Sequence, residues 1–428
     1  MSQFLALEKY SIGVGDRFGH QAQAQLRACM LADKNGARVI PVWNKSHREH
    51  VIIGSEPSST QRAAREAVEA LAWKHPFHVD ADHVRLETVE RFLPFSDYFT
   101  LDVGDAIGGP ISSDAVRNFT DRHPELSAEV PVKRLSEPLR SSQTGLENVL
   151  RMYLPAALQA GKIYRHIASA KADSPFITEV SMDETDRPQT PFELLVVLAA
   201  LADEGVKVQT IAPKFTGRFN KGIDYVGDVA RFTREFRDDL AVVAFAIQKY
   251  DLPSNLKLSI HSGSDKFSLY EPIRNALKEF DAGLHLKTAG TSWLEELIGL
   301  AQANQESCAM VKHIYFAALR RIDELCEPYA AVIAIERSEL PCQTVVEKWT
   351  PSRLVSAISH NPSNPDYNPH MRQLLHVGYK IAAEMGAAYT GALPRHKGLI
   401  SERVTVNLYE NHLKPLLLGS RALPSHQV

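Results

Sequence analysis

The chain has 428 residues, of which 44% are hydrophobic, and this is enough to bury the core of one large domain or of two. Its 48 basic and 51 acidic residues give a formal net charge of -3, so charge gives no reason to expect nucleic acid or an anionic membrane surface as a partner. Four cysteines without a CxxC pair argue against a disulfide framework or a zinc knuckle and favour a cytoplasmic protein. Neither a signal peptide nor an apolar run long enough to cross a membrane is expected.

Short apolar segments alternate with helical ones along most of the chain. Strands are predicted over residues 11–19, 37–46, 75–84, 97–104, 176–185, 206–215, 256–266 and 283–293. Helices are predicted between them, among others over residues 59–74, 191–205, 227–250 and 268–280. This alternation predicts a parallel sheet, and eight such units are what a closed (β/α)8 TIM barrel requires. No strand is followed by a GxGxxG or GxxxxGK[ST] motif, which disfavours a nucleotide-binding sheet.

Two segments depart from the repeating unit. Residues from about 104 to 175 are too many for a simple crossover, and they predict an insertion after the fourth strand. Beyond about residue 305 the strand pattern stops and helical patterns continue. We therefore expect a catalytic barrel over residues 1–305 and a helical C-terminal extension over residues 306–428, packed on the barrel.

Charged residues gather at the predicted carboxyl ends of the strands, where the active sites of such barrels lie. They are Asp16, Arg17, Lys45, Asp82, His83, Asp102, Asp183, Glu184, Lys214, His261, Asp265, Lys266 and Lys287. Strands of a parallel barrel are buried, so charges at their ends must be satisfied. Their convergence on one mouth predicts a polar functional site rather than eight unrelated solvated loops.

Two histidines are placed where they could bind the same metal ion. His83 ends the third predicted strand, in the stretch HVDADHV, and His261 ends the seventh. Because these ends can face each other across a barrel mouth, the pair predicts a divalent transition metal, with an oxygen atom as a further ligand. The alternative is that each imidazole hydrogen-bonds only a backbone carbonyl.

Asp82 and Glu179 are the candidate acid–base residues. Glu179 lies inside an apolar strand, and desolvation there is expected to raise its pKa toward the range of a proton donor. A buried ion pair of Glu179 with Lys214 or Lys287 is an equally good interpretation. The lysines at the strand ends could also hold an anionic or polyhydroxylated substrate.

Several motifs together are similar to one known family. They are GVGDRFG, HVDADHV, EVSMDET-x-x-PQTPFE, APKFTGRFNKGIDYVGD, SIHSGSDKFSLY, HLKTAGTSWLEE and MRQLLHVGY, in this order from about residue 13 to about residue 380. The chain thereby resembles the tagaturonate epimerase family. The resemblance implies a metal-dependent enzyme that interconverts tagaturonate and fructuronate, or the neutral pair tagatose and fructose.

The resemblance also implies roles for individual residues. Asp82 would be the proton acceptor and Glu179 the opposing proton donor. His83 and His261 would bind the metal (Zn, Mn, Co or Ni), with Asn220 as the third ligand and Asp183 as its competitor. Glu49, in SHRE, resembles a further catalytic segment without a defined role. The substrate-binding residues that we expect are Asp16, Arg17, Lys214, Asp265, Lys266 and Lys287.

The sequence leaves more than one substrate and more than one reaction open. Lys214 stands where the family pattern has arginine, and lysine cannot offer a carboxylate the same bidentate fork. The sugar is therefore a keto-uronate, a neutral ketose or a phosphorylated one. A metal-dependent aldolase, a ketose isomerase and a non-catalytic carbohydrate-binding barrel are the competing functions. The sequence leaves a homo-oligomer open.

Overall fold

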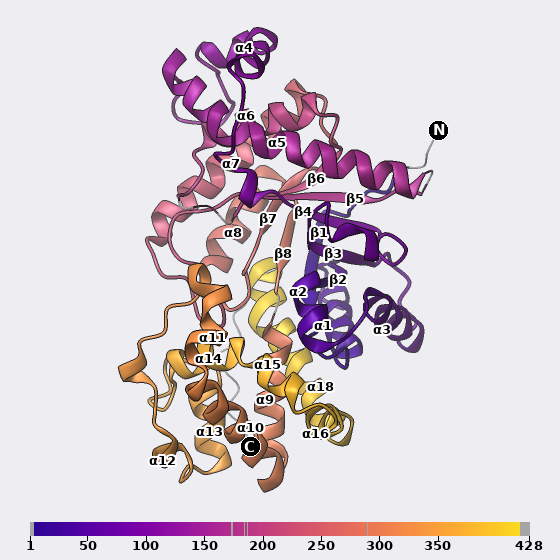
Figure 1. Ribbon diagram of the computed structural model, residues 1–428, viewed down its shortest axis with the longest axis vertical. Coiled ribbons are helices and arrows are strands. Elements are labelled where there is room, and N and C mark those ends of the chain that lie inside the picture. The colour runs from indigo at the N-terminus through magenta and orange to yellow at the C-terminus, as the bar shows by residue number, and fades with distance from the viewer. Residues whose placement is uncertain (1–3, 173, 184, 186, 289, 420–428) are drawn as a thin grey trace.

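Eight parallel strands form the closed barrel that the sequence predicts, hydrogen-bonded in chain order from β1 to β8 (Figure 1). The structure is a computed structural model that describes residues 4–172, 174–183, 185, 187–288 and 290–419, and Glu184, one of the charged residues predicted at the strand ends, lies outside these ranges. The strands are β1 Tyr10–Gly15, β2 Ile40–Ser46, β3 His78–Val84, β4 Tyr98–Asp102, β5 Ile177–Ser181, β6 Val208–Ala212, β7 Lys257–Ile260 and β8 Leu284–Lys287. Each strand overlaps its predicted segment, and β5 to β8 are buried at every position. Burial on both faces explains why the strands read as apolar runs without alternation.

Helices surround the barrel and return the chain to the start of the next strand, except between β3 and β4, which are joined through the short 3-10 helix η1 (Val89–Arg91). The helices are α1 Ala22–Lys34, α2 His47–Ile53, α3 Pro57–Ala70, α4 Ser113–Arg122, α5 Gln143–Lys171, α6 Pro191–Asp203, α7 Val229–Lys249, α8 Phe267–Phe280 and α9 Thr291–Ala303. The start of α6 shows how the sequence sets a boundary. Thr190 and Glu193 form a capping box there, and Pro191 occupies the first helical turn. No helix in the described part of the chain is long and apolar enough to cross a membrane.

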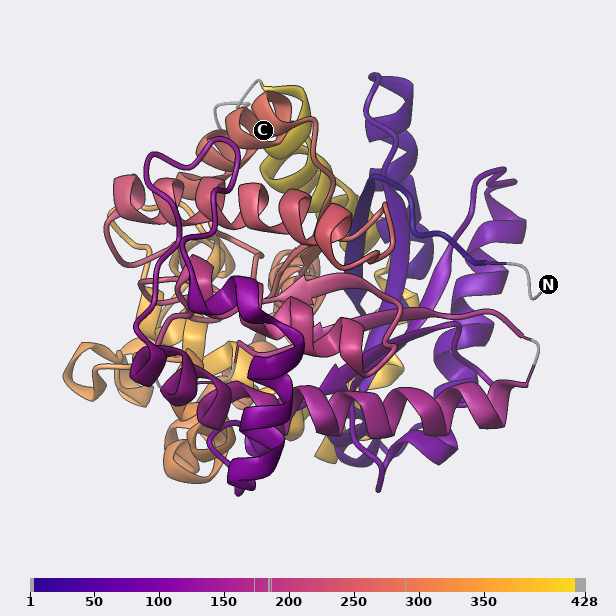
Figure 2. The same cartoon turned by 90° about the horizontal axis from the view of Figure 1, so that it is seen from above.

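The segment between β4 and β5 contains two different parts. Residues 104–142 form the short 3-10 helices η2 (Gly104–Ala106) and η3 (Pro124–Ser127), the helix α4 and irregular loops. The 29-residue helix α5 follows and packs against α6, as a helix of the barrel does (Figure 2). The extra chain is therefore residues 104–142, and α5 is the barrel's own helix.

Helices continue after α9 without further strands in the described residues. They are α10 Gln305–Arg320, α11 Ile322–Cys326, η4 Glu327–Val332, η5 Arg337–Glu339, α12 Gln343–Val346, α13 Pro351–Ile358, α14 Pro369–Val377, α15 Tyr379–Glu384, α16 Ala387–Thr390, α17 Ala392–Arg395, α18 Lys397–Val406 and the π-helix η6 Asn407–Leu418. One apolar cluster joins Ile12 and Trp43 of the barrel to Trp293, Leu374 and Leu408. The extension and the first barrel strands thus share one hydrophobic core.

An ion pair fixes the amino-terminal end of β3. His78 is buried, and its Nδ1 donates to Asp97 Oδ2 at 2.9 Å, while Nε2 lies 3.7 Å from Glu8 Oε2. Burial alone would lower the pKa of His78. The hydrogen bonds with Asp97 and Glu8 outweigh burial and raise this pKa to about 9.

Replacing His78 with glutamine should therefore destabilise the protein in a pH-dependent way. Because the folded-state pKa is raised, the stabilisation by His78 is complete below its unfolded pKa of about 6.5 and is lost as pH rises through about 9. We expect His78→Gln to lower the free energy of unfolding by about 1 to 3 kcal/mol near pH 6. The deficit should shrink by pH 10 in denaturant titrations. The exposed His313→Gln is the control, and a pH-independent deficit for His78→Gln would contradict the ion pair.

Candidate active site

The ammonium group of Lys287, at the carboxyl end of β8, lies among three carboxylates inside the barrel. Its Nζ donates to Asp82 Oδ1 at 2.6 Å and to Asp80 Oδ2 at 2.9 Å, and it lies 2.9 Å from Glu179 Oε1. All four side chains are almost fully buried. Gly13 makes room for this lysine, because a Cβ atom at residue 13 would lie 3.0 Å from Lys287 Cγ. Lys287 is therefore one of the two ion-pair partners that the sequence suggests for Glu179.

Glu179 is completely enclosed and accepts several hydrogen bonds. Its Oε2 accepts from Tyr98 at 2.9 Å and from Thr210 at 2.8 Å, and its Oε1 accepts from His261 Nε2 at 2.8 Å. Burial would raise the pKa of Glu179, but the charges of Lys287 and His261 hold it well below its usual range. The expectation of a raised pKa is thus wrong, because it counted desolvation without the two cations. Glu179 is therefore an ionised carboxylate. It does not itself line the cavity at the barrel mouth, but its partners His261 and Lys287 do.

Asp80 is a site residue to which the sequence analysis assigns no role. It lies two residues before Asp82, and the period of two in a strand puts both carboxylates on one face of β3. Burial and the charges of Asp82 and Glu179 raise the pKa of Asp80 to about 7, against the opposing effect of Lys287. Asp82 differs, because Lys287 and His83 outweigh burial and hold its pKa well below the usual range. Asp82 is therefore ionised at neutral pH.

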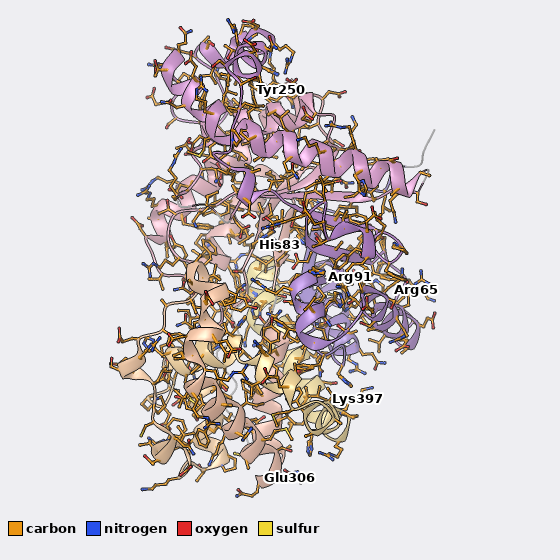
Figure 3. The ribbon with its side chains drawn as sticks, viewed as in Figure 1. Arg65, His83, Arg91, Tyr250, Glu306 and Lys397 are labelled. Carbon is orange, nitrogen blue, oxygen red and sulfur yellow. The ribbon has the colours of Figure 1, made fainter. Side chains whose placement is uncertain are left out.

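His83 lies near the centre of the molecule, between the barrel and the extension (Figure 3), and His261 lies beside it. Their ring centroids are 5.2 Å apart. His83 has a positive φ of 53°, beside a register shift between β3 and β4, so a strained backbone aims its side chain. Asp183 Oδ1 lies 3.2 Å from His261 Nδ1.

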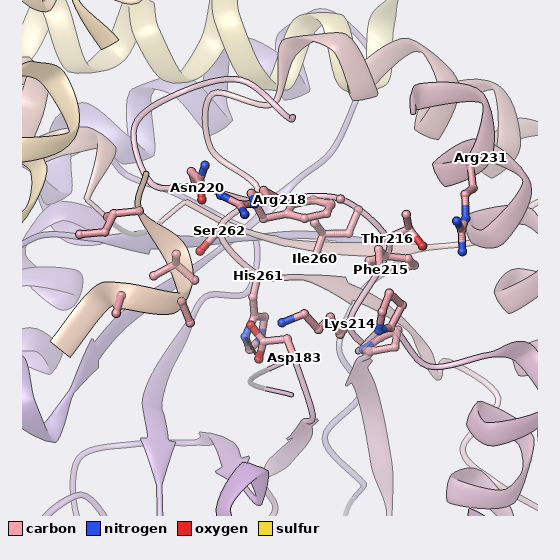
Figure 4. A pocket seen from close by; sticks show the side chains of 18 residues that line it. Asp183, Lys214, Phe215, Thr216, Arg218, Asn220, Arg231, Ile260, His261 and Ser262 are labelled. Atoms are coloured by element: carbon pink, nitrogen blue, oxygen red, sulfur yellow. Dashed lines mark ion pairs between the residues drawn. The ribbon is translucent and has the colours of Figure 1, made fainter. Parts of the chain in front are cut away.

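Two imidazoles are ligands that a divalent transition metal accepts, but His261 would have to lose its proton and one of its two carboxylate contacts to bind one. Two imidazoles bonded tetrahedrally to one metal by bonds of about 2.1 Å would place their ring centroids about 5 Å apart. No group of three or more His, Cys, Asp and Glu side chains in the described ranges is arranged to hold a metal ion. Asn220 is buried and lines the adjoining cavity together with Asp183 and His261 (Figure 4).

Two cavities meet at these residues. One, of about 410 Å³, opens over Asp82, His83 and Lys287, and the other, of about 600 Å³, extends over Lys214 and Asn220. Asp183, His261, Ser262 and Val332 line both. Each cavity by itself has the size of a small-molecule site. Among the residues predicted to bind substrate, Arg17 and Lys287 line the first cavity and Lys214 lines the second.

The structure does not bring three predicted substrate-binding residues to these cavities. Asp16 accepts from the backbone N–H groups of the next turn, at Gly19 and Gln21. Asp265 pairs with Arg372 of the extension at 3.2 Å, and Lys266 donates to backbone carbonyls, among them that of Asn220 at 2.8 Å. Asp265 and the nearby Ser262 both have positive φ values, and this turn carries the loop away from the direction of β7. Asp265 and Lys266 thus hold the loops in place.

Three further residues, to which the sequence analysis assigns no role, line the mouth. Arg48 lies in α2, Lys221 follows Asn220, and Tyr329 comes from η4 of the extension; all three line the first cavity. Burial and the charges of Arg17 and Arg48 lower the pKa of Lys221 to about 8. Glu49, which the family resemblance singles out, forms an ion pair with Arg17. NKGID and SHRE are motifs that could have pointed to Lys221 and Arg48, whereas nothing in the sequence around Tyr329 places it at the mouth.

Comparison with known proteins gives consistent matches. The model of a family described as tagaturonate epimerase matches residues 2–391. The tagaturonate/fructuronate epimerase of Thermotoga maritima is 30% identical over 382 residues, which are 86% of this chain and 72% of that protein. A glycerol-complexed crystal structure of the fructuronate-tagaturonate epimerase from Cohnella laeviribosi superposes with a TM-score of 0.79 at 23% identity, covering 97% of this chain and 82% of that one. Its native crystal structure gives 0.77 at 23% identity with the same coverage. These two structures establish the fold.

Removing the charge of Lys287 should destabilise the protein strongly. In Lys287→Met, Asp80, Asp82 and Glu179 would face one another without a cation, and breaking a buried ion pair on one side removes about 3 to 5 kcal/mol of stability. Lys214→Met is the matched control, because Lys214 lines the second cavity with no carboxylate within 4.0 Å among the described residues. Denaturant titration should show a loss for Lys214→Met of under about 0.5 kcal/mol.

A second substitution tests the cause of this loss. Adding Asp82→Asn to Lys287→Met removes one of the repelling charges and should restore part of the lost stability. Equal stabilities of the Lys287→Met and Lys214→Met proteins would show that the three carboxylates do not depend on the ammonium.

Proposed function

The chain belongs to the tagaturonate epimerase family, and on this premise we propose that it interconverts tagaturonate and fructuronate by inverting the carbon β to the ketone. The observation that carries this proposal is the pair of carboxylates, Asp82 and Glu179, on the ammonium of Lys287 beside two histidines. An ionised Asp82 in the cavity wall can accept a proton, and His261 or Lys287, the protonated partners of the ionised Glu179, can return one.

The position of the inverted carbon determines the chemistry. Its C–H bond is β to the ketone and is not acidic, so enolisation cannot invert it. We propose cleavage of the bond between the α and β carbons, with Asp82 taking the proton of the β-hydroxyl group as that bond breaks. The electron pair of the bond passes to the α carbon and the adjacent ketone, which gives an enediolate and an aldehyde. The aldehyde turns, the carbon–carbon bond re-forms on its other face, and the new hydroxyl group receives a proton.

The source of the returning proton follows from the contacts of Glu179. Glu179 is enclosed, and its Oε1 contacts both His261 and Lys287, which line the cavity. We propose that Glu179 acts on the face opposite Asp82 by holding His261 and Lys287, whose N–H groups supply the returning proton.

We also propose that His83 and His261 bind a divalent metal (Zn, Mn, Co or Ni), with Asn220 as third ligand and Asp183 as the alternative. When bound, such an ion supplies Lewis-acid polarisation of the substrate's ketone oxygen. The support is the spacing of the two rings and the oxygen atoms of Asn220 and Asp183 around the same cavity.

A product analysis tests the reaction. The purified protein should be incubated with a divalent metal and with keto-uronates, ketohexoses or their phosphates, and the products followed by NMR. We expect tagaturonate and fructuronate to interconvert without three-carbon fragments. Accumulation of fragments would favour an aldolase, migration of the carbonyl would favour a ketose isomerase, and binding without any product would favour a carbohydrate-binding protein.

Asp82→Asn should lower turnover by at least about 10²-fold while the protein stays folded, because the amide keeps the shape and loses the proton acceptor. Asp102→Asn is the matched control, since Asp102 lines the same cavity and pairs with Arg85. Steady-state kinetics on tagaturonate should show a loss for Asp102→Asn of less than about tenfold. Near-normal turnover of Asp82→Asn would remove Asp82 from the mechanism.

His83→Ala should lose bound metal together with activity, because two remaining ligands hold an ion poorly. Metal analysis of dialysed protein measures this directly, and Asp82→Asn should retain its metal. A His83→Ala protein with full metal content would contradict the proposed ligand set.

A further inference from the structure

Three cations from separate segments of the barrel line the first cavity, at the mouth of the barrel. Arg17 follows β1, Arg48 lies in α2, and Lys221 lies in the loop after β6. None of them belongs to the cluster formed by Lys287 with Asp80, Asp82 and Glu179, which we call the Lys287 cluster. Together they form the positively charged side of the cavity, which we call the cation cluster (Arg17, Arg48 and Lys221).

Two tyrosines of the extension hold the cation cluster in place. The guanidinium group of Arg48 lies 4.6 Å from the ring centroid of Tyr329, and Lys221 Nζ lies 6.0 Å from the same centroid. Arg17 lies 4.3 Å from the ring centroid of Tyr379, and the two tyrosine hydroxyl groups are 2.9 Å apart. The rings attract the cations electrostatically and orient them before any anion arrives.

The backbone of the extension adds to this orientation. The N–H group of Lys221 donates to the Val332 carbonyl at 2.8 Å, and Arg48 donates to the Pro328 carbonyl at 3.4 Å. Because these bonds leave the ammonium of Lys221 and part of the Arg48 guanidinium available, both can still receive an oxyanion.

Within the cation cluster only Arg17 has a carboxylate in direct contact in the part of the chain that the structure describes, while Asp183 and Asp82 attract Lys221 from a longer distance. Glu49 pairs with Arg17, but no carboxylate among the described residues lies within 4.0 Å of the Arg48 or Lys221 nitrogens. In the second cavity Arg231 pairs with Glu235 at 3.0 Å, and Lys214, whose side chain points toward Asp183 in Figure 4, lies on the far side from Arg48. The unmatched positive charge thus lies on the Arg48–Lys221 side of the mouth.

We propose that Arg48 and Lys221 bind the carboxylate of a keto-uronate, with Arg17 as a positioning residue, and so make this chain selective for uronates over neutral ketoses. This inference rests on the proposed function. The position fits the substrate, because Lys221 Nζ donates to Ser262 Oγ at 3.4 Å and Ser262 follows His261. A keto-uronate has its carboxylate only two carbons from the carbon that inverts, so the carboxylate and the reaction centre must be close neighbours. The first cavity also accommodates a six-carbon sugar acid.

The carboxylate subsite has a second consequence for the proposed reaction. After the carbon–carbon bond breaks, the carboxylate stays on the aldehyde fragment. Salt bridges from Arg48 and Lys221 would therefore hold this fragment while its carbonyl turns, and would prevent its escape into solvent. A subsite of this kind separates an epimerase from an aldolase.

Substitution of the two cations tests the proposal. We expect Lys221→Gln and Arg48→Gln each to weaken binding of tagaturonate by about 10- to 100-fold in calorimetry and to change binding of tagatose by less than about twofold. Lys221→Arg should recover most of the tagaturonate affinity. Arg91→Gln is the matched control, because Arg91 pairs with Glu56 near α2 and does not line the mouth cavity.

Kinetics give a separate readout. In Lys221→Gln, kcat/KM should fall for tagaturonate and stay within about twofold for tagatose, and three-carbon fragments should appear among the products. Equal losses for both sugars, or unchanged binding of tagaturonate, would overturn the carboxylate subsite. A wild-type protein that binds tagaturonate through these cations without converting it would refute the proposed function and leave the subsite standing. A wild-type protein that binds no keto-uronate would refute both.

Discussion

The ion pairs between the ammonium of Lys287 and three carboxylates are the interactions on which the rest of the site depends. All three carboxylates lie within 2.9 Å of this ammonium, and without a cation they could not be ionised together inside a barrel. The same contact sets which groups are charged: Asp82 and Glu179 stay ionised, while Asp80 has a pKa of about 7. Lys287 therefore both stabilises the fold and sets the protonation of the carboxylates around it.

The extension completes the site as well as covering the barrel. Tyr329 lies in the cavity wall, Arg372 contacts Asp265 and the Gly222 carbonyl, and Val332 holds the backbone of Lys221. These contacts position the loops after β6 and β7 from the outside. Lys287 and its three carboxylates come from the barrel, and the residues that orient the charged mouth come in part from the last third of the chain.

The barrel and the residues nearest its axis could be predicted from the sequence because both depend on local patterns. Buried parallel strands read as apolar runs, and their charged ends identify Asp82, His83, His261 and Lys287. Asp80 could have been found as well, from the alternation of side chains along β3. The direction of the Glu179 pKa could not, because it depends on the net effect of burial and two cations from other strands.

Other parts of the site depend on packing between distant segments, which periodicity does not record. Asp265 and Lys266 follow His261 closely, yet a turn with positive φ sends them to Arg372 and to backbone carbonyls instead of the mouth. Tyr329 has no motif of its own, and only the docking of η4 brings it beside Lys221. The roles of the residues at the mouth remain predictions that the variants above address.

The shared core has a consequence for how the protein is made. Ile12 and Trp43 lie near the start of the chain, but the same apolar cluster includes Leu374 and Leu408, more than 300 residues later. A ribosome releases the first two strands long before these partners exist, so the strands must wait with apolar surface uncovered. Closing such distant contacts is slow. Chains truncated before the last helices should be exposed to aggregation and proteolysis during synthesis, even when every residue of the Lys287 cluster is present.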